Sequence, residues 1–141
     1  MRKTLCALAL LSAITLGGCA SNGMRWCPCG RAARQSEPVL RHVVLFQFND
    51  HLTAEEIQEV EEAFAALAEK IDEIHDFEWG TDVSVEGLDD GFTHCFVVTF
   101  QSEADRDAYL PHPDHEAFVE LLSENNRLAR ALVVDYWTQR P

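Results

Sequence analysis

Hydrophobic and polar residues alternate in four stretches of the 141-residue chain, and each stretch predicts a β-strand. The stretches are residues 42–48, 77–83, 92–100 and 131–137. In 92–100 the large apolar side chains and His94 share one face of the predicted strand. In 42–48 both alternate sets are largely apolar, which is typical of a strand covered on both faces. We expect helices on one face of the sheet and a partner subunit on the other.

Apolar residues spaced three and four apart predict a helix between the first two strands. Thr53 and Glu56 fit a capping box, so we expect this helix to begin at Ala54. Its apolar stripe continues to Ile74 and consists of Ile57, Val60, Phe64, Leu67, Ile71 and Ile74.

Two prolines interrupt a second helical region after the third strand. This region begins after Ser102 and runs to about Leu110, where Pro111 and Pro113 break it, and Asp114 is expected to cap a further helix. The resulting order is β-α-β-β-α-β. It predicts an α+β fold, a ferredoxin-like sandwich.

Titratable side chains are concentrated at this proline-rich joint, which holds Tyr109, His112 and His115. His42 opens the first strand and His94 lies on the third, and a sheet with helices on one face could bring all five to one cavity. Imidazoles exchange protons near neutral pH and a phenol can stabilise a developing oxyanion, so the set suits acid–base chemistry. Each residue also has a structural explanation, such as helix capping or a satisfied interior histidine.

The N-terminus has the features of a bacterial lipoprotein. Residues 1–18 contain two basic residues followed by a short apolar segment, which is typical of a signal peptide. Cys19 follows Leu16-Gly17-Gly18, a sequence that resembles a lipobox, and is the expected lipidation site. We expect residues 19–41 to form a lipidated, flexible, basic tether. The expected location is the bacterial cell envelope, on the periplasmic or outer-membrane face, held by a lipid anchor.

Charge and cysteine content limit the partners. From His42 to Pro141 five basic residues face twenty-three acidic ones, a net charge of −18, which disfavours a nucleic-acid partner. Cys27 and Cys29 could bind a soft metal, form a strained disulfide, or stay unused or redox-active. Cys95 is expected to be a small buried residue.

Several motifs in order resemble the stress-responsive A/B barrel (Dabb) family. They are His42-Val43-Val44-Leu45-Phe46-Gln47-Phe48, Phe77-Glu78-Trp79-Gly80-Thr81-Asp82-Val83, Gly91-Phe92-Thr93-His94 with Val98-Thr99-Phe100, Tyr109 through His115, and Asp135-Tyr136. The resemblance implies that residues 42–141 form such a domain and that two copies pair as a dimeric α/β barrel.

The resemblance also implies site residues. By similarity to a plant polyketide cyclase of this family, which closes its substrate by an aldol condensation without a cofactor, His115 would be the general base. Tyr109 would hold the substrate carbonyl and His42 would support them. His94 and His112 match histidines of that enzyme, and with Trp79 we expect them to line the cavity. Phe64 replaces a cavity tyrosine, so the pocket wall differs.

Three functions remain open on the sequence. The first is a membrane-anchored homodimer that binds a small apolar molecule, or serves in a stress response, without an assignable reaction. The second is a cofactor-independent acid–base enzyme of the polyketide cyclase or aldol type that uses His115 and Tyr109. The third is a metal-binding lipoprotein that uses His112 and His115, although Pro113 argues against a regular helix between them.

Overall fold

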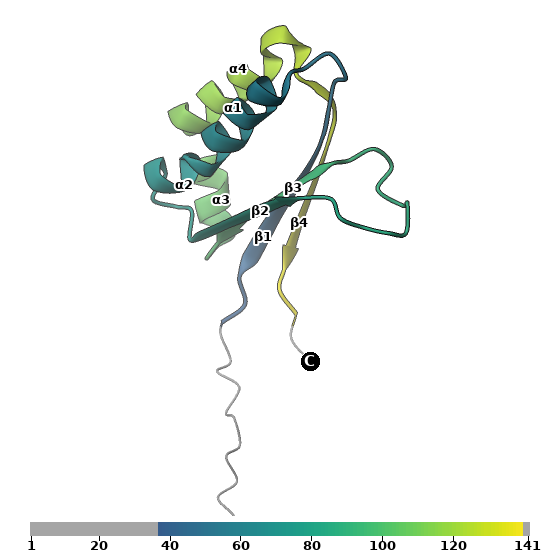
Figure 1. The fold of residues 1–141 in the computed structure, drawn as a ribbon. Coiled ribbons are helices and arrows are strands. Elements are labelled where there is room, and N and C mark those ends of the chain that lie inside the picture. The colour runs from purple at the N-terminus through teal and green to yellow at the C-terminus, as the bar shows by residue number, and fades with distance from the viewer. Residues whose placement is uncertain (1–36, 140–141) are drawn as a thin grey trace, which may run out of the picture. The chain divides into compact units, whose positions relative to one another are not determined.

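The computed structural model describes residues 37–139, which form a four-stranded sheet with helices packed against one side (Figure 1). The order of elements confirms the ferredoxin-like α+β fold. The strands are β1 (Leu40–Phe48), β2 (Asp76–Thr81), β3 (His94–Phe100) and β4 (Leu128–Trp137). The helices are α1 (Ala54–Ala65), α2 (Leu67–Lys70), α3 (Glu103–Tyr109) and α4 (Pro113–Ser123), followed by a 3-10 turn, η1 (Glu124–Asn126).

The sheet is built around β1. Its order is β2-β3-β1-β4, and every neighbouring pair is antiparallel. Alternation along β1 buries Val44 and Phe46 under the helices and turns Val43 and Leu45 to the other side. β1 begins at Leu40, two residues before the alternating pattern predicts.

The capping box at the start of α1 is confirmed. The Glu56 backbone N–H donates to the Thr53 hydroxyl at 3.2 Å, and the Thr53 N–H donates to the Glu56 carboxylate at 2.9 Å. The expectation of one helical stripe to Ile74 was wrong, because α2 ends at Lys70. Ile71 has an extended backbone but is only 1% exposed, so the connection to β2 itself fills the core.

Helix α4 begins two residues earlier than expected, because His112 and not Asp114 is its N-cap. The Asp114 backbone N–H donates to Nδ1 of His112 at 3.2 Å. Pro113 occupies the first helical position, where its fixed φ suits a helix and its missing N–H costs nothing. The capping role of His112 leaves Asp114 inside the helix.

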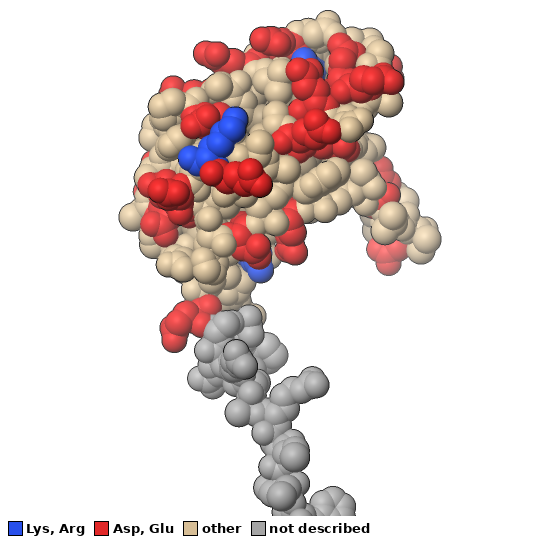
Figure 2. Space-filling model, turned by 60° about the vertical axis from the view of Figure 1, so that its left-hand side comes forward, with Lys and Arg blue, Asp and Glu red and all other residues tan. Residues whose placement is uncertain are grey.

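Aromatic rings dominate the core between the helices and the sheet. Phe64 of α1 lies 4.6 Å, centroid to centroid, from both Phe96 of β3 and Phe118 of α4. The buried apolar core consists of Leu40, Val44, Phe46, Phe48, Val60, Phe64, Leu67, Ile71, Phe96, Val98, Phe100, Tyr109 and Phe118. Outside this core, acidic side chains are scattered over the helical layer with few basic ones between them (Figure 2).

The opposite side of the sheet, here called the outer face, is also apolar. In the part of the chain that the structure describes, no helix covers it (Figure 1). Leu132 and Val134 are 44% and 48% exposed. Cys95 is half-buried on this face rather than buried, since alternation along β3 points it away from the helices. The outer face comprises Val43, Leu45, Cys95, Val97, Leu132, Val134 and Tyr136.

Candidate functional site

A cavity of about 370 Å³ lies between the helices and the β1–β4 side of the sheet. Its walls are mostly apolar, and four polar residues gather in its lining: His42, Tyr109, His115 and Asp135. The apolar lining residues are Val44, Phe46, Phe64, Leu110, Phe118, Val119, Leu122, Leu128, Ala131 and Val133. An apolar cavity with a few convergent polar groups is the usual form of a small-molecule site.

His115 lies in the first turn of α4, and a hydrogen bond fixes its tautomer. Its Nδ1 lies 2.9 Å from the carbonyl oxygen of Leu110. A carbonyl only accepts, so Nδ1 carries the hydrogen, and Nε2 of the neutral ring keeps its lone pair. Burial lowers the pKa of His115, and the hydrogen bond to Leu110 partly opposes this effect. The neutral ring, which can accept a proton, is therefore favoured.

Tyr109 is the last residue of α3 and is fully buried. Burial raises the pKa of its phenol, so the hydroxyl stays protonated at neutral pH. Within residues 37–139 this hydroxyl has no hydrogen-bond partner. Its ring lies 4.3 Å from that of His115, centroid to centroid. A buried donor without a partner costs about 1–3 kcal/mol. A ligand oxygen in the cavity would remove that cost.

His42 belongs to a chain of hydrogen bonds that joins β1, β4 and α3. The β1–β4 register places it opposite Asp135, and its Nδ1 lies 2.7 Å from Oδ1 of that carboxylate. Arg106 of α3 donates to the other carboxylate oxygen at 3.1 Å. Asp135 thus accepts the Nδ1 hydrogen of His42 and leaves Nε2 as the acceptor of the neutral ring. The His42 ring also lies 6.0 Å from Tyr109.

Of the other expected site residues, Phe64 lines this cavity, whereas His94, His112 and Trp79 do not. His42 of β1 pairs with Val98 of β3, and His94 lies four residues before Val98 on that strand. This separation is roughly 13 Å at the usual rise of a strand. Its Nε2 pairs with Glu61 at 3.0 Å and it lines a second cavity. His112 caps α4, and Trp79 stacks on Phe96 at the sheet edge, 42% exposed.

Sequence reasoning missed Asp135 and Arg106 as members of the site. Asp135 is the one charged residue in the apolar stretch 131–137, and a carboxylate in such a stretch indicates a residue with a specific partner. Arg106 precedes Tyr109 by three residues on α3, which places both on one side of the helix. Nothing in the sequence links either residue to His42, because the pairing spans 93 residues.

The described residues contain no group of three or more His, Cys, Asp or Glu side chains arranged to hold a metal ion. Within residues 37–139 no helix has the length and apolarity needed to cross a membrane. The expected signal peptide, the lipidation site Cys19 and the pair Cys27 and Cys29 lie outside the described residues.

Comparison with known proteins supports this reading of the fold. The stress responsive A/B barrel domain profile matches residues 40–138. The stress-response A/B barrel domain-containing protein HS1 of Arabidopsis thaliana is 37% identical over 97 residues, covering 69% of this chain and 87% of that protein. Olivetolic acid cyclase of Cannabis sativa is 28% identical over 97 residues, covering 69% of this chain and 94% of that enzyme.

Solved structures agree with the family profile. Hydroxynitrile lyase from Passiflora edulis superposes with a TM-score of 0.67 at 26% identity, covering 73% of this chain and 95% of that one. A dimeric ferredoxin-like protein of unknown function from Thermobifida fusca gives a TM-score of 0.60 at 26% identity, covering 70% and 90%. The chain therefore belongs to the stress-responsive A/B barrel domain family.

Proposed function

We propose that this chain forms a homodimer that binds a small, largely apolar molecule in the cavity beside β4. The observation that carries the proposal is the buried Tyr109 hydroxyl, which has no partner within residues 37–139 and belongs to the cavity lining. Because its raised pKa keeps it protonated, it is a donor that needs an acceptor. The ligand should therefore carry a carbonyl or a similar oxygen.

The lining of the cavity indicates which chemical groups the ligand should carry. Val44, Phe64 and Phe118 contribute to apolar walls that suit a hydrocarbon or aromatic body. At the polar end Tyr109 donates, while Nε2 of His115 accepts. A molecule with an acceptor oxygen next to an acidic C–H or O–H would satisfy both groups.

The homodimer is supported by the outer face and by the relatives. An exposed apolar sheet face of this kind is typical of an interface. The solved relative from Thermobifida fusca is described as dimeric, as is one from Bacteroides fragilis. A second copy packed on the outer face would cover it and give the apolar side chains of β1, β3 and β4 a partner.

Acid–base catalysis is the second candidate function, and one specific observation favours it. The Leu110 carbonyl fixes His115 in the tautomer whose Nε2 is a base, beside a phenol that can hydrogen-bond an enolate oxygen. His115 would take a proton from the carbon next to a carbonyl, and Tyr109 would stabilise the oxyanion that forms. Two relatives are named as enzymes, a cyclase and a lyase.

Native mass spectrometry of the mature chain, purified in mild detergent from its own host, tests both the dimer and the ligand. We expect twice the monomer mass, with an organic molecule of sub-kilodalton mass released on denaturation. The variant Tyr109→Phe removes only the donor and should retain less of that molecule. A monomer would contradict the homodimer, and a dimer that carries nothing in either protein would contradict the binding function.

We also propose that the chain is anchored in the bacterial cell envelope through a lipid on Cys19. The support is the sequence pattern of residues 1–19, since lipid attached at one residue holds a protein on a membrane surface without a spanning helix. In a bacterial host that makes lipoproteins, the chain should partition into the detergent phase of Triton X-114. Cys19→Ala should move it to the aqueous phase, whereas equal partitioning of both proteins would contradict the anchor.

A further inference from the structure

The loop between β2 and β3, residues 82–93, extends away from the sheet on the side opposite the helices (Figure 1). We call this segment the arm. Val83, Val85 and Leu88 are 89%, 98% and 80% exposed, which makes them the most exposed large hydrophobic residues that the structure describes. Three strongly exposed apolar side chains on one projecting loop are typical of an interaction site.

The base of the arm is tied firmly to the sheet. The Asp82 N–H donates to the Thr93 carbonyl at 2.8 Å, which closes the loop. Arg130 of β4 pairs with the Asp90 carboxylate at 2.9 Å and lies 4.7 Å from the centre of the Phe92 ring. Gly91 has a φ of +85°, and a Cβ there would lie 2.7 Å from the Gln47 side chain. The direction of the arm is therefore set by the fold.

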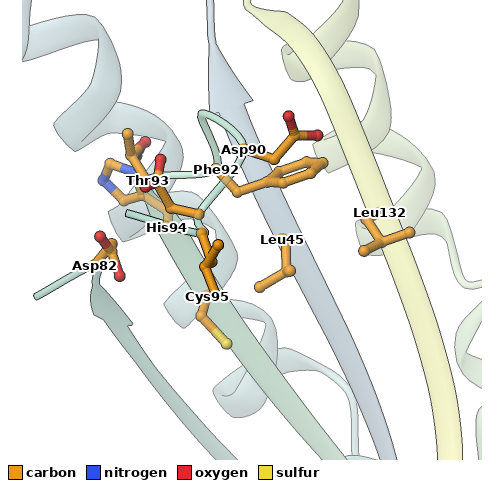
Figure 3. A pocket seen from close by; sticks show the side chains of 10 residues that line it. Leu45, Asp82, Asp90, Phe92, Thr93, His94, Cys95 and Leu132 are labelled. Carbon is orange, nitrogen blue, oxygen red and sulfur yellow. Dashed lines mark hydrogen bonds between the residues drawn. The ribbon is translucent and has the colours of Figure 1, made fainter. Parts of the chain in front are cut away.

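A cavity of about 410 Å³ lies where the arm meets the outer face. Its floor consists of Leu45, Cys95 and Leu132, which project from three neighbouring strands, with Phe92 and Asp90 at the base of the arm (Figure 3). Leu88 of the arm also lines it. The arm and the apolar outer face are thus two walls of one continuous surface.

We propose that the arm clasps a second copy of this chain, so that Val83 and Val85 pack on the partner while an apolar side chain of the partner enters this cavity. The proposal rests on the homodimer proposed above and adds the element that secures it. A second copy is the occupant that fits, because the arm continues the outer face and the ferredoxin-like relatives are dimeric. In a two-fold dimer each arm would reach the other subunit, so every arm contact occurs twice.

The charge of the arm argues against a lipid surface as the occupant. The segment carries four carboxylates, Asp82, Glu86, Asp89 and Asp90, and contains no Lys or Arg. Anionic headgroups would repel them. Asp82, Asp89 and Asp90 also line the cavity, where Asp90 is paired with Arg130, so the contact with an equally acidic second copy is made by the apolar side chains of the arm.

The test compares the dimer dissociation constant of the full mature chain in mild detergent with that of Val83→Ser/Val85→Ser, measured by sedimentation equilibrium. Both valines are exposed, so the substitution should leave each subunit folded. Loss of the buried methyl groups from two arms should weaken the dimer at least about tenfold. Ala117→Ser changes an exposed apolar residue of α4, in the helical layer and outside both cavities, and should leave the constant unchanged.

The outcomes separate the arm from the dimer. If the wild-type chain is a dimer and the arm variant dimerises equally well, the arm inference is overturned and the homodimer stands. If the wild-type chain stays monomeric across the micromolar range, the homodimer fails and the arm loses its partner. Hydrogen exchange gives a second readout: amides of residues 83–88 should exchange more slowly in the dimer, and equal exchange at low and high protein concentration would overturn the inference.

Discussion

Replacing His115 by alanine is expected to lower the rate of deuterium uptake into an enolisable ketone by about 10²–10⁴-fold, the usual contribution of a general base. Phenylacetone in D₂O, followed by ¹H NMR, is a suitable probe because it joins an aromatic body to an activated C–H beside a carbonyl. His115 would remove the proton and return a deuteron to the same carbon, while the Tyr109 hydroxyl holds the enolate oxygen. Tyr109→Phe should lose part of the rate.

A matched histidine serves as the control for this experiment. His112 lies three residues before His115 and acts as the N-cap of α4 outside the cavity. His112→Ala should cost about 0.5–2 kcal/mol of stability but keep the exchange rate. If deuterium enters phenylacetone no faster with the wild-type chain than in buffer, the result contradicts catalysis on this class of substrate. The proposed ligand-binding function would be unaffected. A full rate in His115→Ala would contradict the assigned base.

The pH dependence of the same reaction follows from the environment of His115. A base works in its neutral form, and burial lowers the pKa of this imidazole below the ordinary value of about 6.5. The rate should therefore persist below pH 6.5 and fall only as the pH drops through the lowered pKa. The free energy of unfolding should also fall as the pH falls, because the unfolded chain binds this proton at a higher pH than the folded chain does. Acidification below pH 6.5 should thus reduce the free energy of unfolding.

Phe96→Ala is expected to lower the free energy of unfolding by about 3–5 kcal/mol, the usual cost of deleting a fully buried ring. Phe96 is 0% exposed and lies on β3, the strand that joins β1 to β2. Its ring stacks on Phe64 at 4.6 Å and on Trp79 at 5.7 Å, and it lies 5.2 Å from Phe46. Removal would leave a void beneath α1 that these rings cannot fill without leaving their own positions.

Phe77→Ala offers a comparison in which the same atoms are removed. Phe77 lies on the edge strand β2 and is only partly buried, so its loss should cost clearly less. Urea unfolding at one fixed protein concentration measures both variants, because dimerisation makes stability depend on concentration. Equal losses in the two proteins would contradict a larger contribution of the fully buried Phe96 to the aromatic core.

The sequence alone determined the elements of this fold, because their signals are local. The Thr53–Glu56 capping box needs four consecutive residues, and strand β3 is predicted by the alternation of large apolar and smaller side chains within one segment. The order of these elements was sufficient to predict the ferredoxin-like sandwich. The resemblance of its motifs, carried over residue by residue, also selected His42, Tyr109, His115 and Phe64, which do meet in one cavity.

Only the tertiary structure decided which of the chemically suitable residues share the site. His94 has the same side chain as His42 and the same face of the sheet, but strand register places it beside Glu61 instead. Register likewise brings Asp135 to His42, and α3 adds Arg106 to that carboxylate. Such pairings join residues far apart in the chain. Local patterns do not encode them, because they arise from how strands align and helices pack once the core has formed.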